Sequence, residues 1–375
     1  MKIYRLAIIR QKYRPDGGSE RFASQMISIL KTQNLNLNII TRKWKNIINS
    51  NCNIHLCNPF IFSRINREKG FSKKAKLICK KEKFDLIQSH ERISGCDIYR
   101  AGDGVHRRWL IQRARIMSKW KRKLLFLSNY HRYIINAEHK MYSSPKLKAI
   151  ICNSKMIKQE IIDDFNIPSE KISIIYNTID HKKFIPSNTI QRNILRKKFL
   201  IPEKAHCLIF VGSGFERKGL SATIQAVSKT DSYLLVIGKD KSEKCYHDLA
   251  KSLGCIHRIR FMGIQKKILP FYQISDALIL PTLYDPFPNV IIEALSCGLP
   301  VITSTTCGGS EFIISNKNGF IIDALNISEI SSAILSLPRK ILESKMSKEA
   351  RLCILFYTPS YLLKKLFSLY NRLIK

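Results

Sequence analysis

Two carboxylates stand eight residues apart in the segment Tyr284–Thr303, on either side of the expected start of a helix. Pro281 ends a short apolar run, and two further prolines favour an extended loop before apolar helical spacing begins near Asn289. We therefore expect Asp285 in a loop at the mouth of a site, and Glu293 about one turn into a helix whose first N–H groups can meet an anion. The Glu293 carboxylate can accept hydrogen bonds from both hydroxyls of a ribose diol, and Asp285 can accept hydrogen bonds from sugar hydroxyls. Taken alone, the pattern also fits a loop cap and a solvated helix charge.

A basic pair, Arg217 and Lys218, follows the expected strand Cys207–Ser213. We expect the pair to lie in a glycine-containing loop that includes Gly212, before a helix that begins near Gly219. Arginine offers a planar fork and lysine a compact charge, so together they can neutralise a diphosphate whose charge grows as it departs. In a very basic protein, an ordinary basic turn has the same appearance.

Two pairs of glycines follow apolar strands. Gly308 and Gly309 come after the run PVITST, so their backbone amides could approach a ligand closely. Gly17 and Gly18 lie between the strand in IYRLAIIR and a helix expected at about Ser19, which is the phosphate-facing arrangement of a Rossmann-like unit. The three spaced glycines of a dinucleotide fingerprint are missing. By itself, each pair is also typical of a simple turn.

Alternating strand and helix patterns run from residue 2 to 177 and again from 207 to about 336, with a linker near residues 180–191. Each series predicts an α/β domain with a mostly parallel sheet. A chain of 375 residues with 45% apolar content can bury a core in each of two domains. We place the first domain at residues 1–180 and the second at 181–357, and we expect an amphipathic helix over residues 358–375.

The motifs together resemble the carboxyl-terminal half of the retaining glycosyltransferases of the GT-B fold, whose pattern is Glu, seven residues, Glu. Asp285 stands here where the family has the first Glu. The blocks VGSGFERKGL, IGKD and EALSCGLPVIT and the total length are most similar to lipopolysaccharide core glucosyltransferases that act on inner-core heptose. The similarity runs from Ala7 to about Ile314. It implies two Rossmann-like domains facing a central cleft, with the carboxyl-terminal helix crossing back to the first domain.

The resemblance implies a role for each matched residue on the donor side. Arg217 and Lys218 would stabilise the departing diphosphate, Glu293 would hold the ribose, and Asp285 would contact the donor sugar. Further donor contacts are implied at Gly17, Gly18, Glu20, Gly212, Gly308, Gly309, Ser310 and Glu311. The leaving phosphate itself would accept the proton of the acceptor, and neither a metal nor a cofactor beyond the nucleotide-sugar co-substrate, UDP-glucose, is implied.

Asp103 is the candidate residue on the acceptor side, because it matches an acidic residue that is thought to face the acceptor in the similar core enzymes. It follows the third apolar strand region, Leu86–His90, and is flanked by two glycines, a pattern that a turn aspartate also shows. His106 is a candidate proton carrier, although a single histidine is more often a surface or packing residue.

The chain carries a formal charge of +36, from 64 basic and 28 acidic residues, which predicts attraction to polyanions. The segment from His106 to Arg132 holds nine Lys or Arg residues and no acid, interleaved with aromatic and leucine residues. This pattern is typical of a membrane-surface segment, and a solvated basic loop and helix is the alternative. The residues expected to face the membrane and the acceptor are Arg107, Arg108, Trp109, Lys119, Trp120, Lys121, Arg122 and Lys123.

No apolar run approaches the roughly 18 residues of a transmembrane helix. Charges at Lys2, Arg5 and Arg10 interrupt any signal segment. Eleven cysteines without metal-type spacing favour reduced thiols, and we expect no metal site. We therefore expect a cytoplasmic protein that is peripheral on the cytoplasmic face of the inner membrane.

The sequence predicts a retaining hexosyltransferase that moves glucose from UDP-glucose to a lipid-linked oligosaccharide such as a lipopolysaccharide core. One alternative keeps the fold but uses UDP-GlcNAc, UDP-galactose or GDP-mannose for capsule or O-antigen, and another makes the protein an epimerase or polymer synthase. A different class, a polyanion- or nucleic-acid-binding protein, would also use Lys, Arg and aromatic residues, but no recognition motif of that class is present.

Overall fold

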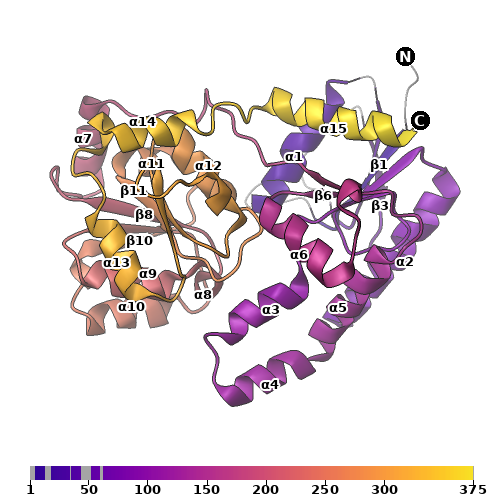
Figure 1. The fold of residues 1–375 in the computed structure, drawn as a ribbon, viewed down its shortest axis with the longest axis horizontal. Helices are drawn as coiled ribbons and strands as arrows, with labels where there is room; N and C mark the ends of the chain where they lie inside the picture. The colour runs from indigo at the N-terminus through magenta and orange to yellow at the C-terminus, as the bar shows by residue number, and fades with distance from the viewer. Residues whose placement is uncertain (1–4, 13–17, 34, 44–51, 60–61, 375) are drawn as a thin grey trace. The chain divides into compact units, whose positions relative to one another are not determined.

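The computed structural model describes residues 5–12, 18–33, 35–43, 52–59 and 62–374. The chain divides into two compact units (Figure 1), the first made of residues 1–178 and 359–375 and the second of residues 179–358. Each unit is an α/β fold around one parallel sheet, which confirms the predicted fold class. Because α7 already begins at Thr189, the linker expected at residues 180–191 is shorter than predicted.

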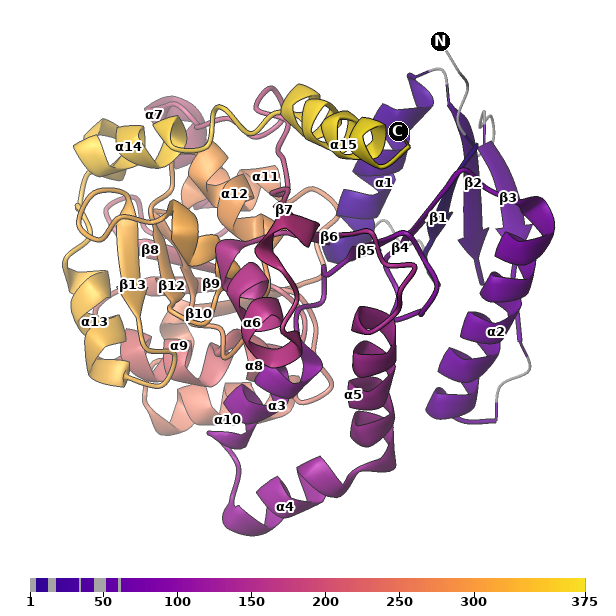
Figure 2. The same ribbon diagram turned by 45° about the vertical axis from the view of Figure 1, so that its right-hand side comes forward.

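The sheet of the first unit has seven parallel strands in the order β3-β2-β1-β4-β5-β6-β7. Figure 2 shows this succession from β3 at the right to β7. The strands are β1 (Arg5–Ile9), β2 (Asn36–Thr41), β3 (Cys52–Leu56), β4 (Leu86–Ser89), β5 (Ile98–Arg100), β6 (Ala149–Cys152) and β7 (Ile172–Ile174). In a parallel sheet all carboxyl ends lie at one edge, so the residues just after these strands are brought together there.

Helices connect the strands of the first unit: α1 (Gly18–Lys31), α2 (Arg64–Glu82), α3 (His106–Ala114), α4 (Lys119–Leu127), α5 (Asn129–Tyr142) and α6 (Lys155–Phe165). Local capping fixes their ends. The side chain of Ser63 accepts a hydrogen bond from the amide of Asn66 at the start of α2, and Ser154 does the same for Ile157 at the start of α6. Helix α6 ends at Asn166 in the left-handed region.

The carboxyl-terminal helix α15 (Pro359–Ile374) belongs to the first unit, as predicted. Figure 1 shows it alongside α1. Its apolar face presents Leu362, Leu366 and Leu369, which are spaced to lie on one side of a helix and are buried in the core that α1 and the strands form. Tyr370 adds a polar contact, because its hydroxyl donates to Gln88 Oε1 at 2.7 Å.

The sheet of the second unit has six parallel strands in the order β10-β9-β8-β11-β12-β13. They are β8 (Cys207–Val211), β9 (Tyr233–Ile237), β10 (Ile259–Gly263), β11 (Ala277–Leu280), β12 (Val301–Ser304) and β13 (Gly319–Ile322). The helices are α7 (Thr189–Lys198), α8 (Phe215–Lys218), α9 (Leu220–Ser228), α10 (Glu243–Ser252), α11 (Leu269–Ile274), α12 (Asn289–Ser296), α13 (Ile327–Leu335) and α14 (Lys345–Leu352). Strands β8 and β11 are fully buried, as expected for central strands covered on both faces.

A buried charge cluster ties α7 to this sheet. Asp276 accepts hydrogen bonds from Arg192 Nη2 at 2.6 Å and from Arg196 Nη2 at 2.8 Å. Both arginines also donate to main-chain carbonyls, including that of Ser275, so the buried charges are paired and hydrogen-bonded. Within the described part of the chain, no helix is long and apolar enough to cross a membrane.

Candidate functional site

Arg217, Lys218 and Asp285 meet in the second unit. Lys218 Nζ donates to Asp285 Oδ2 at 2.6 Å, and Arg217 Nη1 donates to the same oxygen at 2.7 Å and to the carbonyl of Tyr284 at 3.0 Å. Asp285 is 6% exposed and Lys218 is 7% exposed, whereas the Arg217 side chain is 35% exposed. Asp285 lies in the loop between β11 and α12, as predicted, and its carboxylate is buried between two cations.

The electrostatics of this triad follow from its burial. Burial alone would raise the pKa of Asp285, but the charges of Lys218 and Arg217 and their hydrogen bonds outweigh it and lower that pKa to about 2. Burial lowers the pKa of Lys218, and the Asp285 carboxylate opposes that effect. Asp285 is therefore an ionised carboxylate at neutral pH. Arg217 and Lys218 already donate to it, so a second anion bound there would share these two cations with Asp285.

The basic pair lies in the single helical turn α8, and the prediction that it lies in a loop is wrong. Gly214 and Gly219, both with positive φ, bracket this turn. A Cβ at Gly219 would lie 1.9 Å from the carbonyl oxygen of Pro281, so only glycine allows α8 to approach the end of β11. Asp240 fixes the other end, because its Oδ2 accepts a hydrogen bond from the amide of Phe215 at 2.9 Å.

Main-chain contacts hold α8 against the loop that carries Asp285. The amide of Leu283 and the hydroxyl of Thr282 both donate to the carbonyl of Arg217, at 2.8 and 2.9 Å. Gly212, directly after β8, packs against the Lys218 side chain. A Cβ at position 212 would lie 3.3 Å from Lys218 Cε. The loops after β8 and β11 thus bring the basic pair to Asp285, as expected at the carboxyl edge of a parallel sheet.

Glu293 lies in α12, which begins at Asn289 as predicted and leaves Glu293 4% exposed. Its Oε2 accepts a hydrogen bond from the hydroxyl of Tyr272 at 2.8 Å. Tyr272, on α11, is fully buried, and sequence reasoning missed it because a tyrosine in an apolar run gives no sign of its partner. Tyr272 therefore orients one carboxylate oxygen of Glu293.

The glycine loop after β12 forms the 3₁₀ turn η3 (Gly308–Phe312). The amide of Gly308 donates to the carbonyl of Asp285 at 2.8 Å, so the idea that this amide is open to a ligand is wrong. Gly309 packs on Ile291 of α12, whose Cδ1 would lie 2.5 Å from a Cβ at that position. Ser310 and Glu311 follow and are partly exposed. Through Gly308 and Gly309, this loop therefore contacts both the backbone of Asp285 and Ile291 in the first turn of α12.

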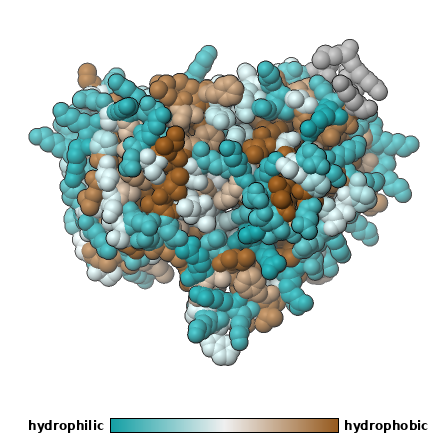
Figure 3. Space-filling model, viewed as in Figure 1, coloured by the Kyte–Doolittle hydropathy of each residue, from teal (hydrophilic) through white to brown (hydrophobic). Residues whose placement is uncertain are grey.

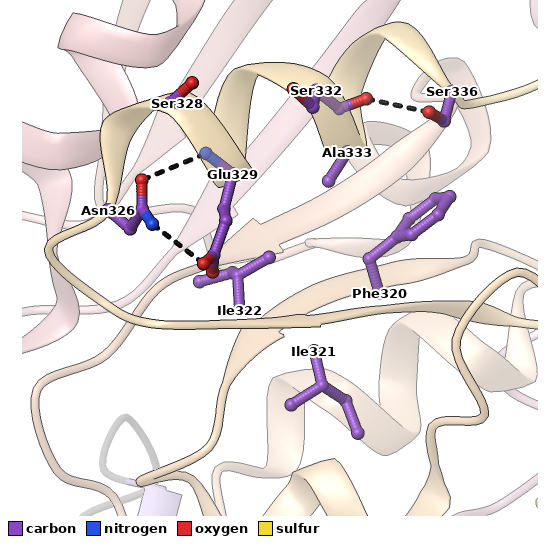
Figure 4. A pocket seen from close by; sticks show the side chains of 9 residues that line it. All are labelled: Phe320, Ile321, Ile322, Asn326, Ser328, Glu329, Ser332, Ala333 and Ser336. Carbon is purple, nitrogen blue, oxygen red and sulfur yellow. Dashed lines mark hydrogen bonds between the residues drawn. The ribbon is translucent and has the colours of Figure 1, made fainter.

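A separate hollow in the second unit, of about 380 Å³, lies between β13 and α13 (Figure 4). The Asn326 side chain accepts from the amide of Glu329 at 3.2 Å and donates to Glu329 Oε1 at 2.7 Å. These polar groups satisfy one another in a helix cap. None of the predicted site residues lines this hollow, whose lining residues are Phe320, Ile321, Ile322, Asn326, Ser328, Glu329, Ser332, Ala333 and Ser336.

Asp103 lies in a turn of the first unit directly after β5, a strand that the sequence analysis missed when it placed Asp103 after the region of β4. Its side chain is 46% exposed, and its Oδ2 lies 4.0 Å from Arg92 Nη1. Arg92 in turn donates from Nε to the buried Glu138 at 2.8 Å, and the amide of His106 donates to the same carboxylate at 3.1 Å. Asp103 is thus held at the carboxyl edge of the sheet.

His106 is paired with another histidine, since its Nε2 lies 3.0 Å from His131 Nδ1. Burial, followed by the charges of Arg92 and His131, lowers the pKa of His106 to about 3. His106 is therefore neutral at physiological pH. Of the amino-terminal donor residues, Gly17 lies outside the described residues, while Gly18 and Glu20 lie in the first turn of α1, where only the backbone is described.

Helices α3 and α4 carry the predicted basic surface. The part on α4, here called the α4 surface, consists of five exposed residues: Lys119, Trp120, Lys121, Arg122 and Lys123, with Trp120 79% exposed. Figure 3 shows hydrophilic and hydrophobic side chains side by side at the lower projection, where α4 lies.

Three predicted members of this surface lie on α3. Arg107 is exposed, but Trp109 is partly buried. Arg108 forms a two-point ion pair with Asp164, at 2.7 and 3.0 Å, which fixes the arginine within the first unit. Arg108 and Trp109 are therefore partly buried within the first unit, and Arg108 is held by an ion pair that the prediction did not include. The acid that pairs with Arg108 is far away in sequence, which is why the local pattern did not reveal it.

Within the described ranges, no group of three or more His, Cys, Asp or Glu residues is placed to hold a metal ion. The chemical capacity of the second unit lies instead in two cations and two carboxylates at one edge of its sheet. Two cations suit a diphosphate and the carboxylates suit hydroxyl groups.

Comparison with known proteins agrees with this chemistry. The family model of glycosyltransferase family 4 matches residues 16–183, and that of glycosyl transferases group 1 matches residues 191–352. The chain is 28% identical over 189 residues to an uncharacterized glycosyltransferase of Methanocaldococcus jannaschii. That alignment covers 48% of this chain and about half the length of the relative (48%). The chain is also 24% identical to the lipopolysaccharide glucosyltransferase WaaG of Escherichia coli. That alignment runs over 332 residues and covers 84% of each protein.

A solved structure of WaaG aligns with this chain at a TM-score of 0.80 and 21% identity, covering 96% of this chain and 98% of that one. This likeness shows the fold, with two Rossmann-like units of the GT-B type. Both halves of the chain match glycosyltransferase models, which confirms the predicted class of enzyme. The chain therefore belongs to the group 1 glycosyltransferases of the GT-B fold.

Proposed function

We propose that this glycosyltransferase is a retaining enzyme that transfers glucose from UDP-glucose to a lipid-linked oligosaccharide, as in lipopolysaccharide core synthesis. The observation that carries the donor side is the meeting of Arg217, Lys218 and Asp285 at one edge of the second unit's sheet, with Glu293 on the neighbouring helix. The similarity to WaaG, a lipopolysaccharide glucosyltransferase, supports the choice of sugar and acceptor class.

On the donor side, Arg217 and Lys218 bind the diphosphate and stabilise the charge that develops as the sugar departs. Arg217, with the more exposed side chain, makes the first contact, and Lys218 shares its charge between the phosphate and Asp285. Glu293 accepts hydrogen bonds from the ribose hydroxyls while Tyr272 holds its other oxygen. Asp285 positions the sugar together with the loop from Gly308 to Glu311. The amide of Gly308 donates to the carbonyl of Asp285 and holds the two segments together.

On the acceptor side, Asp103 orients the attacking hydroxyl at the carboxyl edge of the first unit's sheet. Because its pKa, lowered to about 3, makes His106 a weak base and its Nε2 is paired with His131, we assign proton acceptance to the leaving phosphate and to no side chain. Transfer on the same face of the sugar then retains its configuration. The proposal includes no divalent metal, since the two cations of α8 take the role of neutralising the diphosphate.

The α4 surface places the enzyme at an anionic membrane, where the lipid-linked acceptor resides. Each basic residue near such a surface contributes on the order of 1 kcal/mol. Trp120 is 79% exposed and has the amphipathic ring that suits the interface. The α4 surface thus combines charge and aromatic area, the two elements of reversible attachment without a lipid anchor.

A transfer assay tests the proposed function. The enzyme is incubated in EDTA with membrane glycolipid acceptors and one labelled donor at a time: UDP-glucose, UDP-GlcNAc, UDP-galactose or GDP-mannose. The expected result is labelled glycolipid from UDP-glucose, with the α configuration of the donor kept in the product. Transfer from another donor alone would overturn the choice of sugar, and an inverted product would overturn the retaining mechanism.

A further inference from the structure

Arg100, the last residue of β5, is a buried guanidinium without an ion-pair partner among the described residues. It is 4% exposed, and its Nη2 donates a hydrogen bond to Asn177 Oδ1 at 2.8 Å. Its guanidinium carbon lies 3.7 Å from the ring centre of Phe22, and its Nε has no hydrogen-bond partner. Burial lowers the pKa of Arg100 to about 9, as expected for a cation whose charge is not balanced.

The two buried arginines of the second unit provide a contrast. Arg192 and Arg196 share Asp276, and each of the two also donates to main-chain carbonyls. These two arginines are thus fully paired. Removing a buried charge from water without a partner is costly, so an unpaired buried arginine indicates that an anion binds there in the working protein.

Two further buried polar atoms without partners lie at the same edge of the sheet. Asn153 Oδ1 and Thr178 Oγ1 make no hydrogen bond, and both residues are at least 95% buried. Asn153 lies two residues beyond Ile151, which is opposite Arg100 in the sheet. Thr178 directly follows Asn177, which accepts a hydrogen bond from Arg100 Nη2. The carboxyl ends of β5, β6 and β7 therefore present a cation, an amide oxygen and a hydroxyl together.

The turn after β5 covers the guanidinium. A Cβ at Gly102 would lie 2.3 Å from Arg100 Nη1, so the turn passes directly over the charge. Asp103 in this turn leaves Arg100 unpaired and lies instead 4.0 Å from Arg92. Gly102 and Gly104 flank Asp103, and Gly104 has a positive φ of 69°, which favours glycine.

We propose that Arg100, Asn153 and Thr178 form a phosphate-binding site at the carboxyl edge of β5–β7. The planar fork of arginine binds phosphate oxygens, while the amide oxygen and the hydroxyl bind a hydroxyl group beside the phosphate. The proposal rests on the proposed function in one respect, namely that the first unit receives a sugar. The phosphate group can come from either of two substrates, the diphosphate of the donor or a phosphorylated acceptor sugar.

Thermal unfolding of the full chain with three probes tests the site: inorganic phosphate, UDP and glucose 6-phosphate. A ligand that binds only the folded state raises the unfolding midpoint. In the Arg100→Gln variant we expect about 10- to 100-fold weaker binding of at least one probe, the loss typical of one hydrogen bond to a charged group. The exposed Arg64→Gln variant, with the same loss of charge in the same unit, should bind every probe as the wild type does.

The Asn177→Asp variant keeps the test valid if Arg100→Gln does not fold. The new carboxylate would lie at the position of Asn177 Oδ1, 2.8 Å from Arg100 Nη2, and would occupy the cation permanently. We expect a higher unfolding midpoint without ligand, together with loss of the response to the probe. If wild type, Arg100→Gln and Asn177→Asp respond equally to all three probes, Arg100 is bridged by buried water and the proposal is wrong.

The probes also separate the two sources of phosphate. If only the response to UDP is lost in the Arg100 variant, the site holds the donor diphosphate, and if only that to glucose 6-phosphate is lost, it holds a phosphorylated acceptor. Failure of the proposed function has a different signature. In that case Lys218→Met would leave UDP binding unchanged, while the inorganic phosphate response at Arg100 could still be measured.

Discussion

Lys218 and Asp285 form a buried ion pair in the second unit, with Nζ 2.6 Å from Oδ2. Their side chains are each 9% exposed. The pair serves the fold as well as the reaction, because Lys218 compensates a carboxylate that has little access to water. A substitution at either position therefore changes stability and donor binding together, and these two effects must be measured separately.

Lys218→Met should lower turnover by about 100-fold, since it removes one of two charges that stabilise the leaving diphosphate. It should also lower the free energy of unfolding by on the order of 2 kcal/mol, less than the about 3–5 kcal/mol of a fully unpaired buried charge, because Arg217 remains beside Asp285. Kinetics and urea unfolding measure the two quantities.

A double variant separates the two roles of Lys218. Lys218→Met with Asp285→Asn removes both buried charges and should recover much of the lost stability. Turnover should stay low, since the cation is still absent. Recovery of turnover along with stability would show that Lys218 acts only on folding.

Glu293→Gln should weaken binding of UDP-glucose by about 10- to 100-fold, because a neutral amide replaces the charged acceptor of the ribose hydroxyls. The 2′-deoxyribose analogue of the donor gives the sharper comparison. Wild type should bind the natural donor more tightly than this analogue, whereas Glu293→Gln should bind both alike. Tyr272→Phe, which removes the 2.8 Å hydrogen bond to Glu293, serves as the control and should retain the preference for the natural donor. A variant Glu293→Gln that still discriminates against the analogue would be evidence that Glu293 does not hold the ribose.

Acid should weaken the fold through Asp285. Its pKa in the folded protein, about 2, lies below the usual value of 3.8, so ionised Asp285 stabilises the fold above about pH 4. This contribution is lost as the pH falls from about 4 to about 2, with a slope of up to about 1.4 kcal/mol per pH unit. In Asp285→Asn, the free energy of unfolding should depend less on pH in this range. An unchanged slope would mean that other carboxyl groups account for the acid sensitivity.

Replacing Lys119, Lys121, Arg122 and Lys123 with glutamine should reduce binding to anionic vesicles by about 100-fold or more. Vesicle sedimentation at low ionic strength measures the effect, and hydrolysis of free UDP-glucose should be unchanged. Arg108→Gln is the matched control, because Arg108 is paired with Asp164 and lies outside the α4 surface. We expect this control to lower stability while vesicle binding is retained. Equal vesicle binding by wild type and the fourfold variant would exclude the α4 surface as the attachment site.

The sequence predicted those features that depend on local patterns. Alternating apolar runs and glycine turns identified two parallel sheets, and the start of α12 at Asn289 was found in this way. The return of α15 to the first unit was implied by the resemblance to the GT-B fold. Features that depend on distant partners were missed. Asp285 was expected in a loop at the mouth of a site, but nothing near it in sequence shows that α8 brings two cations to its carboxylate.

The same limit applies to single side chains elsewhere. The partner of Arg108 is Asp164, and the partner of Glu293 is Tyr272. In each case the pairing results from packing between elements that are separate in the sequence. Strand β5, with three residues, was too short for an apolar pattern to reveal, so Asp103 was assigned to the wrong strand end.

The central claim, a nucleotide-sugar site built from α8 and α12, is tested most directly by thermal unfolding in EDTA with a panel of UDP, GDP and ADP sugars. We predict that UDP-glucose raises the unfolding midpoint of the wild type, and that the rise is much smaller in Lys218→Met and Glu293→Gln. If no sugar nucleotide raises the midpoint of the wild type, or if both variants respond as the wild type does, the assignment of this site is wrong.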